Sequence, residues 1–309
     1  GTVPYDVLIL ATGARARDLP IAGAELNNVL SLRTAEDAEA LKLALTPGAR
    51  LAVIGGGYVG LEVAASARAL GCEVVVLERE ARVLARVACE PLSNFFRDQH
   101  QAHGVRFECG VSVESLEGEG KVQGVRLADG RTIACDVAVV GVGAIPNDDL
   151  ARAAGLECGN GVVVDGEARS SDPSIFAIGD VAFRPLPLYD RSARLESVPN
   201  ALEQAKQAAS AIAGRPAPAG EVPWFWSDQY DLKLQIAGIP FDSEDLIVRG
   251  DPAKASFALF HMKGDRILAV EAVNAPAEFM GGRLLIASGK PVDRAKLVDL
   301  SVPMKQVGV

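Results

Sequence analysis

One stretch decides the fold: LAVIGGGYVGLEVAASARALGCEVVVLER, residues 51–79. A short apolar run at 51–54 predicts a buried strand, and the small and apolar residues at 57–70 predict a helix that Gly71 ends as a left-handed stop. A second apolar run at 73–77 predicts the next strand. This order of strand, glycine loop, helix and strand indicates an α/β protein with a parallel sheet.

The loop has the spacing Gly55-x-Gly57-x-x-Gly60, which is typical of dinucleotide sites when a strand precedes it and a helix follows. Gly55 permits the tight turn, Gly57 lets the backbone approach a pyrophosphate, and Gly60 lets the helix pack closely on the strand. The pyrophosphate would lie at the helix N-terminus, where N–H groups and the helix dipole favour an anion. We include Tyr58 and Val59 in this candidate NAD site, Tyr58 as a possible gate of the nicotinamide pocket.

An acidic residue, Glu78, ends the second strand. A carboxylate at this position can accept both ribose hydroxyls of NAD and repel a 2′-phosphate, so the sequence favours NAD. Arg79 follows directly and leaves some room for NADP. The alternative is that residues 78–80 are simply a solvated strand end.

Composition excludes several classes of protein. The 309 residues suggest about two domains, and 49% hydrophobic residues are ample for a core. A net charge of −9, from 31 basic and 40 acidic residues, argues against a nucleic-acid binder. No apolar run approaches the ~18–20 residues of a membrane span, and the first residues do not resemble a leader, so we expect a cytoplasmic protein without membrane contact.

Cysteine and histidine usage gives no metal site. No two cysteines form a CxxC pair, so we expect buried, reduced thiols. The five are Cys72, Cys89, Cys109, Cys135 and Cys158. His100 and His103 occur in a polar stretch and are expected to face solvent. A metal centre would need more ligands than this sequence offers.

Further elements follow from periodicity and turn residues. Strands are predicted at 7–10, 105–108, 122–127, 132–133, 137–140, 161–165, 175–178, 256–262 and 266–273. Helices are predicted at 34–45, 92–102 and 200–212. Thr34 and Asp37 form a variant capping box, and Asp129-Gly130 predicts a hairpin turn. A Pro/Ala-rich linker at 216–220 precedes a separate α+β tail.

Three further segments each end a strand in glycine: YDVLILATGAR, DVAVVGVGAIPN and SSDPSIFAIGDVA. Together with the GGGYVG loop they resemble the hallmarks of two-dinucleotide-binding flavoprotein reductases. The resemblance implies a Rossmann-like NAD domain inserted in an FAD domain, followed by a C-terminal α+β domain. The implied boundaries are 1–20 and 144–215 for the remainder of the FAD-binding domain, 21–143 for the NAD-binding domain and 221–309 for the tail.

The resemblance narrows in three more segments: SLRTAEDA (31–38), RLESVPNALEQAK (194–206) and VPWFWSDQYDLKLQIAG (222–238). These resemble the putidaredoxin reductase-like ferredoxin reductases that serve Rieske-type dioxygenases or haem-thiolate monooxygenases. The implied activity is FAD-dependent transfer of a hydride from NADH and of single electrons to a [2Fe–2S] ferredoxin. Alternatives are the same fold with rubredoxin, a disulfide or a peroxide as acceptor, or a nucleotide-binding module without turnover. No oligomeric state follows.

The resemblance also implies site residues, and each polar or aromatic one could instead be an ordinary surface or core residue. The FAD contacts would be Thr12, Gly13, Arg33, Gly179, Asp180 and the backbone N–H of Val198. Besides the loop and Glu78, the NAD contacts would be Glu62 (nicotinamide carboxamide), Arg79, Arg86 and Gly143. Trp226 would lie near the flavin; core packing is the alternative for Trp224 and Trp226.

Two features bear on the whole protein. The family begins with its own strand–GxGxxG–helix for the ADP half of FAD, and this sequence starts just before the ATG motif. We therefore expect either the C-terminal portion of a longer protein or a truncation. Basic residues in 280–309, and Arg184, Arg191 and Arg194 in 183–194, predict a patch that steers an acidic ferredoxin, or else scattered solvated charge.

Overall fold

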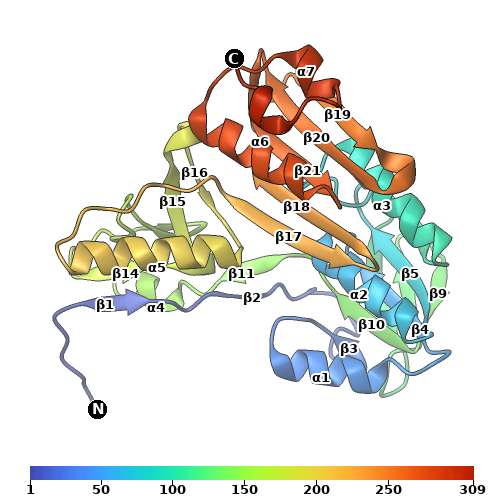
Figure 1. Cartoon of the computed structure of the whole chain (residues 1–309). Helices are drawn as coiled ribbons and strands as arrows, with labels where there is room; N and C mark the ends of the chain where they lie inside the picture. The colour runs from blue at the N-terminus through green and yellow to red at the C-terminus, as the bar shows by residue number, and fades with distance from the viewer. The chain divides into compact units, whose positions relative to one another are not determined.

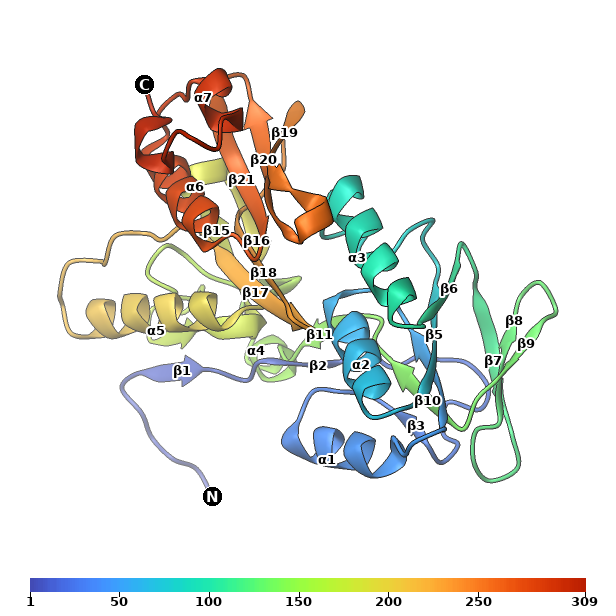
Figure 2. The same ribbon diagram turned by 45° about the vertical axis from the view of Figure 1, so that its right-hand side comes forward.

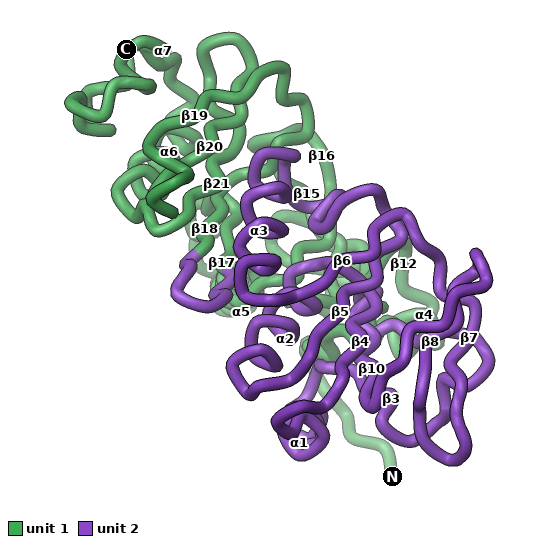
Figure 3. Tube along the Cα trace, turned by 90° about the vertical axis from the view of Figure 1, so that its right-hand side faces the viewer, with its two compact units in different colours: residues 1–15, 145–226, 234–309 green, residues 16–144, 227–233 purple.

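The computed structural model describes residues 1–309, and the chain divides into two compact units (Figure 3). Unit 1 comprises Gly1–Arg15, Ile145–Trp226 and Leu234–Val309, and unit 2 comprises Ala16–Ala144 and Ser227–Lys233. The three domain boundaries expected from the sequence stay a prediction. No helix of the chain has the length and apolar character needed to cross a membrane.

Unit 2 is built on a parallel five-stranded sheet in the order β3-β10-β4-β5-β6 (Figure 1). Its strands are β3 (Val29–Leu30), β10 (Val137–Val140), β4 (Arg50–Ile54), β5 (Glu73–Glu78) and β6 (Arg106–Cys109). The chain runs outward from β4 through β5 to β6, and β10 joins the other side of β4. This change of direction makes the boundary between β4 and β10 a topological switch point, where ligands bind in open α/β sheets.

Three helices accompany this sheet: α1 (Ala35–Ala44), α2 (Tyr58–Ala69) and α3 (Glu90–Ala102). The capping box predicted for α1 is confirmed, because the Thr34 side chain accepts from Asp37 N–H while the Asp37 side chain accepts from Thr34 N–H. The helix α2 follows β4 directly and contacts both β4 and β5. Its position places the glycine loop at the carboxyl end of the sheet.

A second sheet of unit 2 is antiparallel and contributes to the same hydrophobic core (Figure 2). It consists of β7 (Val113–Glu117), β8 (Gly124–Leu127) and β9 (Thr132–Ala134). Leu116, Val125 and Leu127 share one buried cluster with Ala52 and Leu77 of the parallel sheet. The hairpin predicted at 129–130 is confirmed, whereas β7 is a strand that the sequence pattern did not predict.

Before its tail, unit 1 contains two small sheets and two helices. The strand β1 (Leu8–Leu10) pairs in parallel with β14 (Ile175–Ala177). A second sheet orders β12 (Cys158–Gly159), β13 (Gly161–Val163), β15 (Ala182–Leu186) and β16 (Arg191–Arg194). The helices are α4 (Asp149–Ala153) and α5 (Val198–Ile212), and the short strands are β2 (Ala14–Ala16) and β11 (Ala144–Pro146).

The tail forms an antiparallel sheet in the order β17-β18-β21-β20-β19, packed against α6 (Pro276–Ser288) (Figure 1). Its strands are β17 (Trp224–Gln229), β18 (Leu232–Gly238), β19 (Asp245–Asp251), β20 (Ser256–Lys263) and β21 (Arg266–Val273), and α7 (Arg294–Val298) follows. Strands β20 and β21 pair as the sequence predicted. Phe260, Val270 and Phe279 are central members of the tail's buried core.

Three expectations about exposure are wrong. His100 is 0% exposed rather than solvated, because α3 turns it inward. Arg184 is buried and paired with Glu203, so it contributes nothing to a surface patch. All five cysteines are free as expected, but only Cys72 and Cys135 are buried.

Candidate functional site

The glycine loop after β4 is shaped by close backbone contacts. Gly55 has φ +109°, and a Cβ there would lie 2.4 Å from the carbonyl oxygen of Gly141 at the end of β10. A Cβ on Gly60 would lie 2.1 Å from the carbonyl oxygen of Gly55. The predicted reasons for these two glycines, a tight turn and close helix–strand packing, are therefore confirmed.

Gly57 differs from its neighbours because no atom lies within 4 Å of where its Cβ would be. It is the N-cap of α2, no side chain caps this terminus, and the first turn has no acidic residue. Open space in front of a helix N-terminus without an acidic side chain suits a bound anion. The residues present therefore fit the pyrophosphate of a dinucleotide.

Glu78, at the end of β5, accepts backbone hydrogen bonds with both carboxylate oxygens. Its Oε2 accepts from Gly56 N–H at 2.6 Å, and its Oε1 accepts from Glu80 N–H at 2.8 Å. Each oxygen keeps a second lone pair, so the carboxylate is fixed in place and can still accept a hydroxyl. Gly56 was not singled out from the sequence, although a Cβ there would lie 3.0 Å from Glu78 Oε2.

Glu62, in the second turn of α2, is half-buried. Its Oε1 accepts a hydrogen bond of 2.5 Å from the hydroxyl of Ser227. Burial raises the pKa of Glu62 above its usual value, and the Ser227 hydrogen bond opposes that shift. An exposed helix residue, the alternative considered from the sequence, does not describe this side chain.

The other NAD candidates lie around the same end of the sheet. Gly143, with φ +108°, follows β10, the neighbour of β4. The hydroxyl of Tyr58 donates to Val87 C=O at 3.2 Å, while Val59 is exposed. Arg79 and Arg86 are both exposed, and Arg79 pairs with Glu80. Their roles toward NAD stay predictions.

A second candidate edge lies in unit 1, at the carboxyl ends of β1 and β14. Because these strands are parallel neighbours, the segments that follow them, Thr12-Gly13 and Gly179-Asp180, leave the same edge. Gly13 and Gly179 have φ +66° and +75°, a region that favours glycine. The structure therefore brings together the glycines that end two of the three segments YDVLILATGAR, DVAVVGVGAIPN and SSDPSIFAIGDVA.

Asn147, which ends the third segment, is tied to the first by three hydrogen bonds. The Thr12 hydroxyl donates to Asn147 C=O at 2.7 Å, Asn147 Nδ2 donates to Thr12 C=O at 2.8 Å, and Asn147 N–H donates to Gly13 C=O at 2.9 Å. The sequence alone indicated no role for Asn147 at the end of DVAVVGVGAIPN. Its role here is to fix the loop that carries Thr12 and Gly13.

Gln204 of α5 supports the other loop and is completely buried. Its Oε1 accepts from Gly179 N–H at 2.8 Å and from Asn200 Nδ2 at 3.2 Å, whereas its Nε2 has no hydrogen-bond partner in the chain. An unpaired buried donor costs free energy. A further acceptor beside the Gly179 loop therefore fits the residues present.

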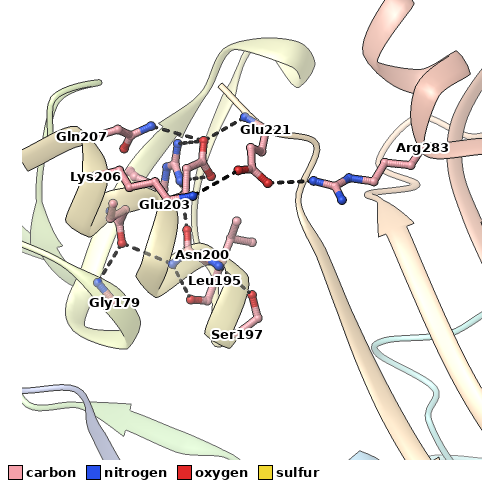
Figure 4. A network of polar contacts seen from close by, with 11 residues as sticks. Gly179, Leu195, Ser197, Asn200, Glu203, Lys206, Gln207, Glu221 and Arg283 are labelled. Carbon is pink, nitrogen blue, oxygen red and sulfur yellow. Dashed lines mark hydrogen bonds and ion pairs between the residues drawn. The ribbon is translucent and has the colours of Figure 1, made fainter. Parts of the chain in front are cut away.

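The helix α5 is anchored by a buried polar network (Figure 4). Arg184 of β15 donates to Glu203 Oε2 at 2.8 Å and to Asn200 Oδ1 at 3.0 Å. Glu203 Oε1 also accepts from Glu221 N–H at 2.9 Å, and the Glu221 carboxylate pairs with Arg283 of α6. The network joins α5 to three other segments of unit 1 and fixes the N-terminal half of α5.

The other residues expected to contact the flavin, Val198, Arg33 and Trp226, are exposed. Val198 begins α5 and is 59% exposed, and its N-cap Ser197 accepts from Asn200 N–H rather than from Val198. Arg33 is exposed and belongs to unit 2. Trp226 is 43% exposed on β17, whereas Trp224 packs on the tail core, its ring 5.7 Å from that of Phe279.

Comparisons with known proteins agree with this geometry. Residues 1–205 match the family "Pyridine nucleotide-disulphide oxidoreductase", and residues 224–308 match "Reductase C-terminal". The chain belongs to the pyridine nucleotide-disulphide oxidoreductase family. The enzymes of this family are oxidoreductases with FAD and NAD(H) as cofactors, so the expected fold class and cofactors are confirmed.

Within the family the chain is similar to ferredoxin reductases. It is 55% identical to the probable ferredoxin reductase CtmF of Castellaniella defragrans, covering 99% of this chain and 76% of that protein. It is 44% identical to putidaredoxin reductase CamA of Pseudomonas putida, covering 98% and 73%. A crystal structure of a covalent putidaredoxin reductase–putidaredoxin complex matches with a TM-score of 0.95 at 44% identity, covering 98% of this chain and 74% of that chain.

Proposed function

We propose that this protein is an FAD-dependent reductase that oxidises NADH and passes single electrons to an acidic [2Fe–2S] ferredoxin feeding an oxygenase. The observation that carries the proposal is the glycine loop at the β4–β10 switch point in a chain 55% identical to a ferredoxin reductase. Further relatives are putidaredoxin reductase CamA at 44% identity and the ferredoxin–NAD(+) reductase component of an anthranilate 1,2-dioxygenase system at 41%.

The residues of unit 2 would bind and orient NADH. The open space before Gly57 and the N-terminus of α2 would take the pyrophosphate, and Glu78, held by Gly56 N–H, would accept the ribose hydroxyls. Glu62 would accept from the nicotinamide carboxamide. Arg79, with Arg86, would border the adenosine half.

The residues of unit 1 would bind the flavin. Thr12 and Gly13, fixed by Asn147, and Gly179, fixed by Gln204, would contact it at the β1–β14 edge, with Asp180 accepting from ribityl hydroxyls. Val198 would offer its N–H from the N-terminus of α5, where the helix dipole stabilises negative charge. When bound, FAD accepts the hydride and releases electrons one at a time. Arg33 and Trp226 would complete the flavin contacts.

The surface that would steer an acidic ferredoxin is smaller than the sequence indicated. Arg184 is buried, and Arg191, Arg283 and Arg294 each pair with an acidic side chain. Of the lysines in 280–309, Lys296 pairs with Asp293, whereas Lys290 and Lys305 are exposed. If steering operates, ferredoxin reduction slows steeply with added salt, while ferricyanide reduction by the same enzyme does not.

The test begins with the visible spectrum of the purified protein without oxygen. A flavin band near ~450 nm that NADH bleaches, followed by rapid reduction of a [2Fe–2S] ferredoxin, supports the proposal. Rubredoxin, a disulfide and a peroxide serve as competing acceptors in the same assay. A bleached flavin that reduces one of these faster than any ferredoxin would overturn the proposed acceptor, and NADH binding without turnover would overturn the enzyme.

A further inference from the structure

A chain of buried polar side chains in unit 2 ends on Glu62. Residues 227–233 belong to this unit: the end of β17 supplies Ser227 and Gln229, the turn before β18 supplies Tyr230, and α3 supplies His100. Gln229 Nε2 lies 3.1 Å from Ser227 Oγ, Gln229 Oε1 lies 2.8 Å from His100 Nε2, and the Tyr230 hydroxyl lies 3.1 Å from His100 Nδ1. We name these five residues, including Glu62, the Glu62 chain.

The carboxylate of Glu62 determines which atom donates and which accepts at every link of the Glu62 chain. An ionised Glu62 can only accept, so the single hydroxyl proton of Ser227 points to Glu62 Oε1. Ser227 Oγ must then accept from the amide nitrogen of Gln229, which turns the amide oxygen toward His100. His100 Nε2 therefore donates, and in the neutral ring Nδ1 accepts from Tyr230. All donors consequently point toward Glu62.

Burial makes this arrangement costly to disturb. Ser227 is 1% exposed, and Gln229 and His100 are 0% exposed. A buried polar group without a partner loses more than a hydrogen bond ordinarily contributes, so a broken link leaves its neighbour unsatisfied. Tyr230 closes the outer end, with its ring stacked 3.8 Å from that of His103. The Glu62 carboxylate is thus held from inside the protein rather than by solvent.

We propose that Ser227 is a positioning residue for nicotinamide recognition, and that Gln229 and His100 hold Ser227 in turn. With Glu62 Oε1 occupied by the Ser227 hydroxyl, Oε2 is the oxygen that accepts an N–H of the carboxamide. The assignment rests on the proposed function, because it takes Glu62 as the carboxamide acceptor. It names the nicotinamide end, not the adenosine end, as the part of the dinucleotide that the Glu62 chain affects.

The test compares two probes that differ only in the nicotinamide: NAD⁺ and ADP-ribose, titrated calorimetrically into the same protein. Ser227→Ala should weaken NAD⁺ binding by about 5- to 10-fold, the effect of losing one ordinary hydrogen bond, and leave ADP-ribose binding unchanged. Gln229→Met should weaken NAD⁺ in the same direction by less. Ser112→Ala, at an exposed serine of unit 2, is the matched control and should change neither affinity.

The outcomes distinguish the proposed role of Glu62 from the proposed role of Ser227. If wild-type protein binds NAD⁺ no more tightly than ADP-ribose, the nicotinamide role of Glu62 fails and this inference fails with it. If wild-type protein does prefer NAD⁺ but Ser227→Ala weakens both probes equally, Ser227 only supports the fold and the inference alone is overturned. An unchanged preference in Ser227→Ala overturns it as well.

Discussion

The loop at residues 55–60 and the β1–β14 edge both place glycines after parallel strands, but they are held in different ways. The loop is shaped by backbone contacts: Gly60 packs against the carbonyl group of Gly55, and Gly55 packs against the carbonyl group of Gly141. The edge is held by side chains from distant parts of the chain, with Thr12 and Asn147 separated by 135 positions and Gly179 and Gln204 by 25. The first site leaves no room for an added atom at Gly55 or Gly60, whereas the second depends on a few polar partners.

This difference predicts separate failures. A change that breaks the polar partners of α5 should loosen the β1–β14 edge and spare the glycine loop. A change that adds an atom at Gly60 should do the reverse. Hydrogen exchange resolved by segment distinguishes the two, because local opening reports the stability of each region separately.

The largest effect is expected from Arg184→Met. It leaves the Glu203 carboxylate buried without its cation, and breaking one partner of a buried pair costs about 3–5 kcal/mol of unfolding free energy. We expect faster hydrogen exchange in residues 175–212 and little change in residues 50–80. Denaturant unfolding together with exchange by mass spectrometry measures both.

The control for that variant is Arg184→Met combined with Glu203→Met. Removing both charges replaces an unpaired buried carboxylate with an apolar contact, so part of the lost stability should return. Recovery stays incomplete because Glu203 also accepts from Glu221 N–H and from Gln207. Equal loosening of both regions in the single variant would contradict the comparison.

The next effect is expected from the pair Gly60→Ala and Gly57→Ala. A Cβ at Gly60 meets a backbone oxygen at 2.1 Å, and this clash should outweigh the ~1 kcal/mol gain in helix propensity and leave a net loss of about 1–3 kcal/mol. A Cβ at Gly57 meets nothing, so its stability should change by no more than about 0.5–1 kcal/mol.

Nucleotide affinity should separate the same two variants. The Cβ of Gly57→Ala occupies the space assigned to the pyrophosphate, so NAD⁺ binding should weaken tenfold or more in a protein that unfolds normally. Calorimetric titration and thermal unfolding on both variants check this. A Gly57→Ala protein with wild-type affinity would mean that the pyrophosphate lies elsewhere.

The glycine loop could be predicted from sequence because its causes are local. The buried strands, the helix and the acidic residue Glu78 all fall within 51–79, and Gly60 packs against Gly55 only five positions earlier. The capping box at Thr34 was predictable for the same reason. The flavin edge was reached through family resemblance instead, since nothing in residues 8–13 alone indicates Asn147 as a partner.

The errors also have a common physical cause. His100, in a polar stretch of α3, is buried where Gln229 and Tyr230 contact it from a hairpin about 130 positions later. Arg184 is buried because Glu203 lies opposite it on α5. Composition predicts such polar residues to be exposed. Tertiary packing brings the partners of His100 and Arg184 to them, and a local sequence pattern does not reveal such packing.

The smallest predicted effect is a pH dependence of the unfolding free energy, which tests whether His100 is buried in solution. Burial lowers the pKa of His100 below its usual value, despite the opposing hydrogen bond to Gln229. Below about pH 6.5 the unfolded chain takes up a proton at this histidine that the folded protein refuses. Unfolding free energy should therefore be highest above that pH and should fall as pH drops toward the folded pKa.

His100→Gln removes this titration, so its unfolding free energy should fall less steeply than that of the wild type between pH 7 and pH 5. The matched control is Gln101→Ala, at an exposed, non-titratable position next to His100 on α3, which should keep the wild-type slope. Denaturant unfolding at a series of pH values measures all three proteins. Parallel curves for wild type and His100→Gln would show that His100 is accessible to protons in the folded state, and the solvated histidine that its polar sequence suggested would then be the better description.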